Sequence, residues 1–209
     1  MKSILLLLLC GMSATAFSQR LSTYGALGFG SSIEKNIAGC DEQNRTRYIG
    51  SMSMYYRVNG RISIGGEALG SGPLNIFNHA SCEMTDQSTN TLWLSPSNLK
   101  SGTVLLRGKM LLLSYKEMEP YISMGIGVNT YSYSDPVKGA GRIKKGTVVM
   151  SPEFGIDIYK FQFACKVIIG GKTPGYNGTD PEQQNRRVSL ESIKAQQVYL
   201  TIGYQLFRL

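Results

Sequence analysis

Eight stretches of the chain alternate between apolar and polar residues with a period of two, which is typical of β-strands that turn one face toward an apolar environment. In the clearest stretch, residues 48–58, Met52 and Met54 share one face while Ser51 and Ser53 share the other. In every stretch one face carries no charged residue. The eight predicted strands cover residues 21–30, 48–58, 62–69, 104–112, 121–129, 148–157, 161–169 and 197–206.

The connections between these stretches alternate strictly between short and long. The short connections are Val58-Asn59-Gly60, residues 116–120 and Tyr159-Lys160. The long connections cover residues 31–46, 71–101, 134–146 and 171–193. This alternation predicts an up-and-down sheet whose long loops all leave the same end.

Face parity limits the length of each short turn, because a one-residue slip moves every side chain to the opposite face. The second and third stretches need an odd loop, which Val58-Asn59-Gly60 satisfies with Gly60 in the left-handed conformation. The two-residue turn Tyr159-Lys160 is even, as the sixth and seventh stretches require. Its register places Glu153 opposite Lys166.

Around residues 116–120, the expected register places Lys109 opposite Gly127 and Arg107 opposite Asn129. The glycines in Gly125-Ile126-Gly127 are therefore interpreted as room for Lys109 rather than as a phosphate-binding loop.

Alternation alone does not decide which face lies inside the barrel. A soluble lipocalin-like barrel places apolar residues inside, whereas a membrane barrel places them outside. The charge-free face, the asymmetric loops and strands of about ten residues favour the membrane barrel. The only tryptophan, Trp93, lies in a long connection rather than near the first strand, where a lipocalin usually carries one.

The N-terminus predicts export. Lys2, an apolar run at residues 4–10 and Ala16-Phe17-Ser18 form a secretory signal of residues 1–18, cleaved before Gln19. Acylation of Cys10, as in a lipoprotein, is the alternative. Residues 19–209 then form one domain.

Composition agrees with a folded β-protein. Among 209 residues, 24 are glycine, 12 are tyrosine and only 17% are charged, which excludes a disordered chain. The formal net charge of +8 does not by itself indicate a nucleic-acid partner, and no nucleic-acid module, metal-ligand cluster or cofactor motif is present in the sequence.

The chain resembles the small eight-stranded outer-membrane β-barrel family of Gram-negative bacteria, which usually ends in an amphipathic strand with a glycine and a terminal aromatic residue. Residues 201–209 contain Gly203 and the amphipathic pattern, but Arg208 and Leu209 depart from it. The resemblance implies an eight-stranded antiparallel up-and-down barrel in the cell outer membrane. It also implies outer-membrane lipid and the barrel assembly machinery as partners, and a monomer.

In a membrane barrel the polar face lines the lumen, which in eight strands has room only for its own side chains. We expect a packed, nearly neutral network because isolated buried charges are costly. A narrow polar path is the alternative. The expected members are Arg57, Glu67, Arg107, Lys109, Glu153, Asp157 and Lys166.

Three further groups of residues are candidates for chemistry or contacts outside the lumen. Lys138, Arg142, Lys144 and Lys145 could contact outer-leaflet lipid phosphates, or simply form a solvated loop. Catalysis by His79 and Ser81 would need a rigidly held pair with an orienting third group. A long loop that contains Cys82, Asp86 and Asn90 does not assure this, so no catalytic residue is expected. Asn177-Gly178-Thr179 matches the glycosylation triplet, a frequent chance match.

After signal removal, three cysteines remain, and export exposes them to an oxidising compartment. Cys40 and Cys82 lie in the first two long connections and are expected to form a disulfide, with three reduced thiols as the alternative. Cys165 lies mid-strand on the apolar face and cannot easily compete.

These observations predict a non-enzymatic outer-membrane barrel that presents loops for binding or envelope integrity. A narrow conduit for small apolar compounds and a soluble periplasmic lipocalin-like carrier are the alternatives.

Overall fold

The computed structural model describes most of the chain beyond the predicted signal segment. The described residues are 21–34, 43–74, 82–87, 90–95, 99–113, 117–134, 142–179, 186–190, 192 and 194–208.

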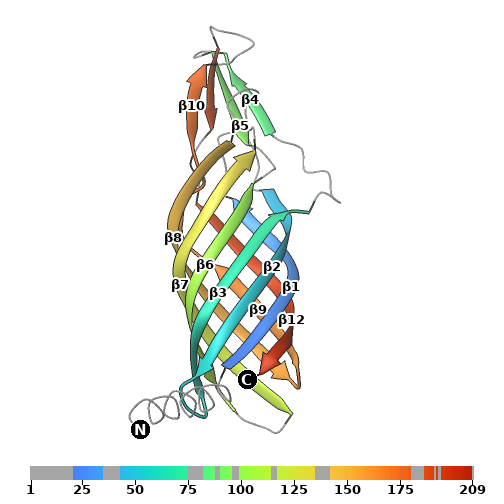
Figure 1. Cartoon of the computed structure of the whole chain (residues 1–209). Helices are drawn as coiled ribbons and strands as arrows, with labels where there is room; N and C mark the ends of the chain where they lie inside the picture. The colour runs from blue at the N-terminus through green and yellow to red at the C-terminus, as the bar shows by residue number, and fades with distance from the viewer. Residues whose placement is uncertain are drawn as a thin grey trace, which may run out of the picture.

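Eight antiparallel strands close into a barrel in the order β1-β12-β9-β8-β7-β6-β3-β2 (Figure 1). The pairing of the first strand with the last closes the barrel. All eight predicted strands are confirmed, and most extend toward the end that carries the long connections. The barrel strands are β1 (Leu21–Glu34), β2 (Gln43–Arg57), β3 (Ile62–Pro73), β6 (Lys100–Leu111), β7 (Met118–Ser134), β8 (Arg142–Ile158), β9 (Phe161–Ile168) and β12 (Ala195–Arg208).

The barrel has two distinct ends. β1 begins and β12 ends at the end that carries the short turns, which we call the turn end (Figure 1). The long connections leave the opposite end, called here the loop end. No helix among the described residues is long and apolar enough to span a membrane.

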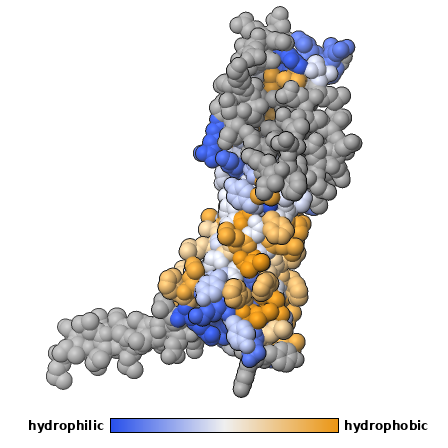
Figure 2. Space-filling model, turned by 90° about the vertical axis from the view of Figure 1, so that its right-hand side faces the viewer, coloured by the Kyte–Doolittle hydropathy of each residue, from blue (hydrophilic) through white to orange (hydrophobic). Residues whose placement is uncertain are grey.

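The two faces of the barrel wall differ in polarity. Strand β6 alternates an exposed and a buried residue along its entire length, with Leu106 66% exposed on the outside and Arg107 fully buried inside. Figure 2 shows the resulting apolar side chains on one side of the barrel. Charges inside and apolar residues outside exclude the soluble lipocalin-like alternative, which requires the opposite arrangement. The protein is therefore a membrane barrel.

Two of the three predicted turn registers need correction. The β2–β3 turn pairs Arg57 with Ser63, so its loop is Asn59-Gly60-Arg61, one residue later than expected. Its length is still three residues, but Gly60 does not have a positive φ. The Asn59 side chain organises this turn instead, because its Oδ1 accepts hydrogen bonds from the backbone N–H groups of Arg61 (2.8 Å) and Ile62 (2.7 Å).

The β6–β7 register differs from the prediction by four residues. Arg107 lies opposite Gly125, and Lys109 lies opposite Ser123, rather than opposite Asn129 and Gly127. Gly125 leaves room for Arg107, since a Cβ atom at that position would lie 3.2 Å from the Arg107 Cγ. The β8–β9 register is as predicted, with Glu153 opposite Lys166.

A second sheet of four short strands lies beyond the loop end (Figure 1). It was not predicted from the sequence. Its order is β10-β11-β5-β4, and the central pair β11–β5 is parallel, so it joins two connections that are far apart in the chain. The strands are β4 (Cys82–Asp86), β5 (Thr91–Ser95), β10 (Tyr176–Thr179) and β11 (Arg187–Leu190).

Candidate functional site

A cluster of four charged side chains fills the lumen nearer the turn end. Arg107 lies 2.6 Å from a Glu67 oxygen and 3.1 Å from a Glu153 oxygen. Lys166 contacts the same two carboxylates, with its Nζ 3.2 Å from Glu153. The four residues come from β3, β6, β8 and β9. Because each carboxylate bridges both cations, the cluster connects opposite walls of the barrel.

Neutral groups complete the hydrogen bonds of this cluster. The Arg107 guanidinium donates to the Ser123 hydroxyl at 2.9 Å and to the Ser151 hydroxyl at 2.6 Å. The Tyr121 hydroxyl donates to the Glu153 carboxylate at 2.8 Å. Satisfying these donors and acceptors is what makes a buried ion cluster tolerable.

A second ion pair lies closer to the turn end. The Lys109 Nζ is 2.5 Å from an Asp157 oxygen, and the Gln162 amide donates to the other Asp157 oxygen at 3.1 Å. The Lys109 ammonium also lies over the Tyr121 ring, 3.9 Å from its centroid, and 5.2 Å from the Tyr24 ring centroid.

Arg57 is the one predicted lumen residue that does not join these groups. It lies at the turn end, where its guanidinium is 3.8 Å from a Glu119 oxygen and both side chains are partly exposed. Glu119 was missed because it lies in the region expected to be a turn, whereas it belongs to β7. Without Arg57 the buried network holds three cations and three carboxylates and is neutral.

Apolar side chains close the lumen next to the four-charge cluster, toward the loop end. These lumen-facing residues form one buried group that spans strands all around the barrel: Ile49, Leu69, Leu105, Val149, Ile168 and Tyr199. The apolar group and the ion cluster therefore lie across the lumen at neighbouring levels.

Arg47 lies beyond the apolar group and is fully buried. Its Nη2 donates to the Leu99 carbonyl at 2.6 Å and lies 3.4 Å from the Ser71 hydroxyl, but no carboxylate among the side chains that the structure describes forms an ion pair with it. Arg47 was not predicted as a lumen residue because the strand was expected to begin at residue 48. Extending its alternation by one residue would have placed Arg47 in the lumen.

The four-stranded sheet is packed against the barrel mouth. Leu190 of β11 and Tyr176 of β10 contact Leu99, Tyr131 and Tyr133 of the barrel. Val188 and Leu92 lie with Tyr176 in an adjoining apolar group. One face of the small sheet is therefore apolar and attached to the barrel.

Polar side chains line part of the opposite face of the small sheet. This face carries a groove of about 480 Å³. Within it, the Ser189 hydroxyl donates to the Asn177 side-chain carbonyl at 2.7 Å, and Arg187 is exposed. Asn177-Gly178-Thr179, noted as a glycosylation triplet, forms the edge strand β10. The groove is lined by Thr91, Asn177, Gly178, Thr179, Arg187, Val188 and Ser189.

The predicted basic cluster divides between the two faces of β8. Arg142 and Lys144 point outward and are exposed, whereas Lys145 points inward and donates to the Ser192 hydroxyl at 3.0 Å. Lys145 therefore does not belong to a lipid-facing group. Lys138 lies outside the described residues.

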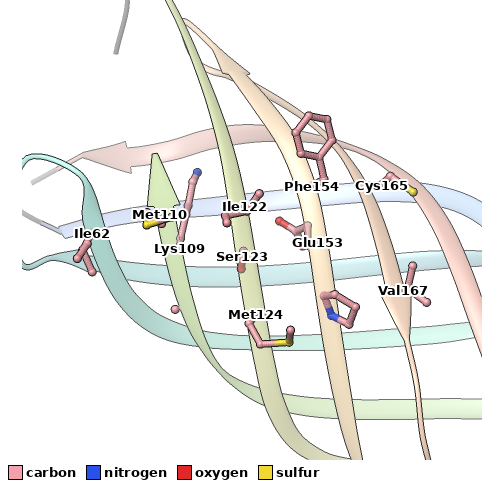
Figure 3. Close-up of a pocket in the computed structure, with 12 residues that line it drawn as sticks. Ile62, Lys109, Met110, Ile122, Ser123, Met124, Glu153, Phe154, Cys165 and Val167 are labelled. Atoms are coloured by element: carbon pink, nitrogen blue, oxygen red, sulfur yellow. The ribbon is translucent and has the colours of Figure 1, made fainter. Parts of the chain in front are cut away.

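Shallow grooves mark the outer wall where small residues interrupt the apolar band. One groove, of about 620 Å³, runs over the outer surface of the barrel from β3 to β9 (Figure 3). Cys165 lies on this outer surface as a free thiol, on the face where the sequence predicted it.

Four candidate residues remain, those of the predicted disulfide and those of the histidine–serine pair. Cys40, His79 and Ser81 lie outside the described residues, and Cys82 is the first residue of β4, so the disulfide stays a prediction. Within the described parts of the chain, no group of His, Cys, Asp and Glu side chains could hold a metal ion.

Comparison with known proteins shows the fold. No protein-family model matches the sequence, and no curated protein matches it. Neisserial surface protein A matches 88% of this chain and 97% of its own, with a TM-score of 0.53 and 8% identity. The match to the attachment invasion locus protein Ail of Yersinia pestis covers 90% of this chain and 99% of Ail, with a TM-score of 0.49 and 11% identity. The chain thus has the fold of the small eight-stranded outer-membrane β-barrels.

Proposed function

We propose that the protein is a non-enzymatic outer-membrane protein whose barrel holds the four-stranded sheet at the cell surface as a binding platform. The observation that carries this proposal is the combination of a filled lumen with an ordered sheet packed on its mouth. In this proposal the chain is exported through a cleaved signal peptide, inserted by the barrel assembly machinery and works as a monomer.

The side chains of the platform suggest what it binds. The groove on the outer face of the small sheet offers hydroxyl, amide and guanidinium groups. Arg186 supports the sheet from one side, because its Nη2 donates to the Thr85 hydroxyl of β4 at 2.5 Å. Such groups suit a hydroxylated or anionic polymer such as a polysaccharide.

Binding is tested with the protein reconstituted in lipid nanodiscs and applied to an array of immobilised neutral and anionic polysaccharides. We expect the native protein to bind a subset of these, and the Asn177→Ala/Arg187→Ala double variant to lose that binding. Arg61→Ala, at the turn end, is the matched control. Binding that survives in the double variant, or no binding to any polysaccharide, would contradict the proposal.

The conduit for small apolar compounds is the second candidate. It requires the ion cluster and the apolar group to separate, since both lie across the lumen. Planar-bilayer conductance and uptake of an apolar dye into proteoliposomes distinguish the two functions. A platform gives neither conductance nor uptake above that of empty membranes.

A further inference from the structure

Three cations gather on the outward face of β6, β7 and β8 at the loop end. The register places Lys100, Ser132 and Lys144 side by side on these adjacent strands. Arg142, two residues beyond Lys144, lies with its Nη2 3.4 Å from the Ser132 hydroxyl, so its guanidinium turns toward this row. Along the described length of these three strands, no acidic residue occupies an outward position.

An open strip separates the cations from the apolar band. A Cβ atom at Gly102 or Gly146 would have no neighbour within 4 Å, and the exposed Thr130 lies between them. The next row toward the turn end is the last fully apolar one. It consists of Val104, Val128 and Val148.

The height of the cations above the band can be derived from strand geometry. Lys100 and Lys144 are each four residues from this valine row, or about 13 Å along a strand and roughly 10 Å along the membrane normal at the usual tilt. This height lies at the outer edge of the polar headgroup layer, which the flexible lysine side chains can reach. The two lysines are two strands apart, about 10 Å, so both flexible side chains can reach one anion held between them.

We propose that Lys100, Arg142 and Lys144 bind a phosphate group of an outer-leaflet lipid, with the Gly102–Thr130–Gly146 strip accommodating the lipid headgroup. The lysine ammonium groups approach the phosphate from both sides, and Arg142 donates from above. The acyl chains of that lipid continue over the valine row and along the apolar band. This site is independent of the polar face of the small sheet, and the two can be tested separately.

The test measures binding of diphosphorylated lipid A to the detergent-solubilised protein by native mass spectrometry. In Lys100→Gln/Lys144→Gln we expect the affinity to fall roughly twenty-fold, because each cation contributes to attraction at the headgroup layer. The control Arg61→Gln/Lys160→Gln removes the same charge at the turn end and leaves the affinity unchanged. Heat-modifiable gel mobility verifies that both variants are folded.

Two further measurements identify the occupant. Dephosphorylated lipid A should bind the native protein as weakly as the diphosphorylated form binds the lysine variant. Thr130→Glu, which adds an anion to the strip and leaves every cation in place, should give a similar loss. Equal losses in the test and control variants, or binding independent of the lipid's phosphates, would overturn the proposal. Displacement of lipid A by an equal concentration of inorganic phosphate would also overturn it, because the site would then bind a free anion.

Discussion

The two ends of the barrel interior hold buried charge in different ways. Toward the turn end, each of three buried cations lies within ion-pair distance of at least one of three carboxylates. Toward the loop end, Arg47 is buried against a backbone carbonyl and a serine hydroxyl. The apolar group around Leu105 separates the two regions. The contrast indicates that specific ion pairing holds the turn end together, whereas packing against the small sheet holds the loop end.

The largest loss in the free energy of unfolding is expected for Glu67→Gln, because this variant leaves two buried cations sharing one carboxylate. Breaking a buried ion network on one side typically costs about 3–5 kcal/mol. The measurement is the free energy of unfolding by urea in lipid vesicles. Adding Lys166→Met restores neutrality and should recover more than half of the loss. A cost for Glu67→Gln below about 1 kcal/mol would show that the cluster behaves like a solvent-exposed one.

At the loop end, a comparable contribution to stability is expected from the disulfide rather than from buried charge. The bond between Cys40 and Cys82 would enclose 41 residues, a closure of about 3–4 kcal/mol in the chain-entropy model. Mass spectrometry of the alkylated, unreduced protein should find one labelled cysteine, Cys165. Three labelled cysteines would show that the loop end lacks this cross-link.

Variants on the outward face of the barrel wall provide a reference for the stability changes at both ends of the interior. Met54 lies on the apolar band and is 52% exposed, so Met54→Arg should cost about 2–4 kcal/mol near the membrane midplane. Ser53→Arg instead adds a cation beside Glu67 in the crowded lumen. Urea unfolding in vesicles distinguishes them, since only the Ser53 variant should be partly rescued by a second substitution, Lys166→Met. A harmless Met54→Arg would reverse the assignment of the faces.

The barrel could be predicted from the sequence because alternation is local. A strand of about ten residues shows its two faces without reference to its partners, and this also placed Glu67, Arg107 and Lys166 on the lumen side. The β6–β7 register could not be predicted, because a turn of uncertain length allows shifts by an even number of residues that leave the faces unchanged. The shift reassigned the partner of Arg107 from Asn129 to Gly125.

The small sheet could not be predicted for a different reason. Its strands have four or five residues, and β11 pairs in parallel with β5, which lies in another connection. Contacts of this kind have no signature within either segment. The outward and inward positions of Lys144 and Lys145 were missed because β8 begins at Arg142, inside a stretch expected to be a loop.

The smallest change in the free energy of unfolding is expected for a substitution of Arg47. This substitution gives the most direct comparison between the two ends of the barrel interior. Replacing a buried charge by an apolar side chain of similar length is often neutral or stabilising when no charged partner is left behind. Arg47 has no carboxylate partner among the side chains that the structure describes, so Arg47→Met should change the free energy of unfolding by no more than about 1 kcal/mol. Arg107→Met, the same replacement at the turn end, leaves Glu67 and Glu153 with Lys166 alone and should cost about 3–5 kcal/mol. Both are measured by urea unfolding in the same vesicles, with heat-modifiable mobility as the check of folding. Equal losses in the two variants would mean that Arg47 is as strongly bound as Arg107, and that the loop end also depends on its buried charge.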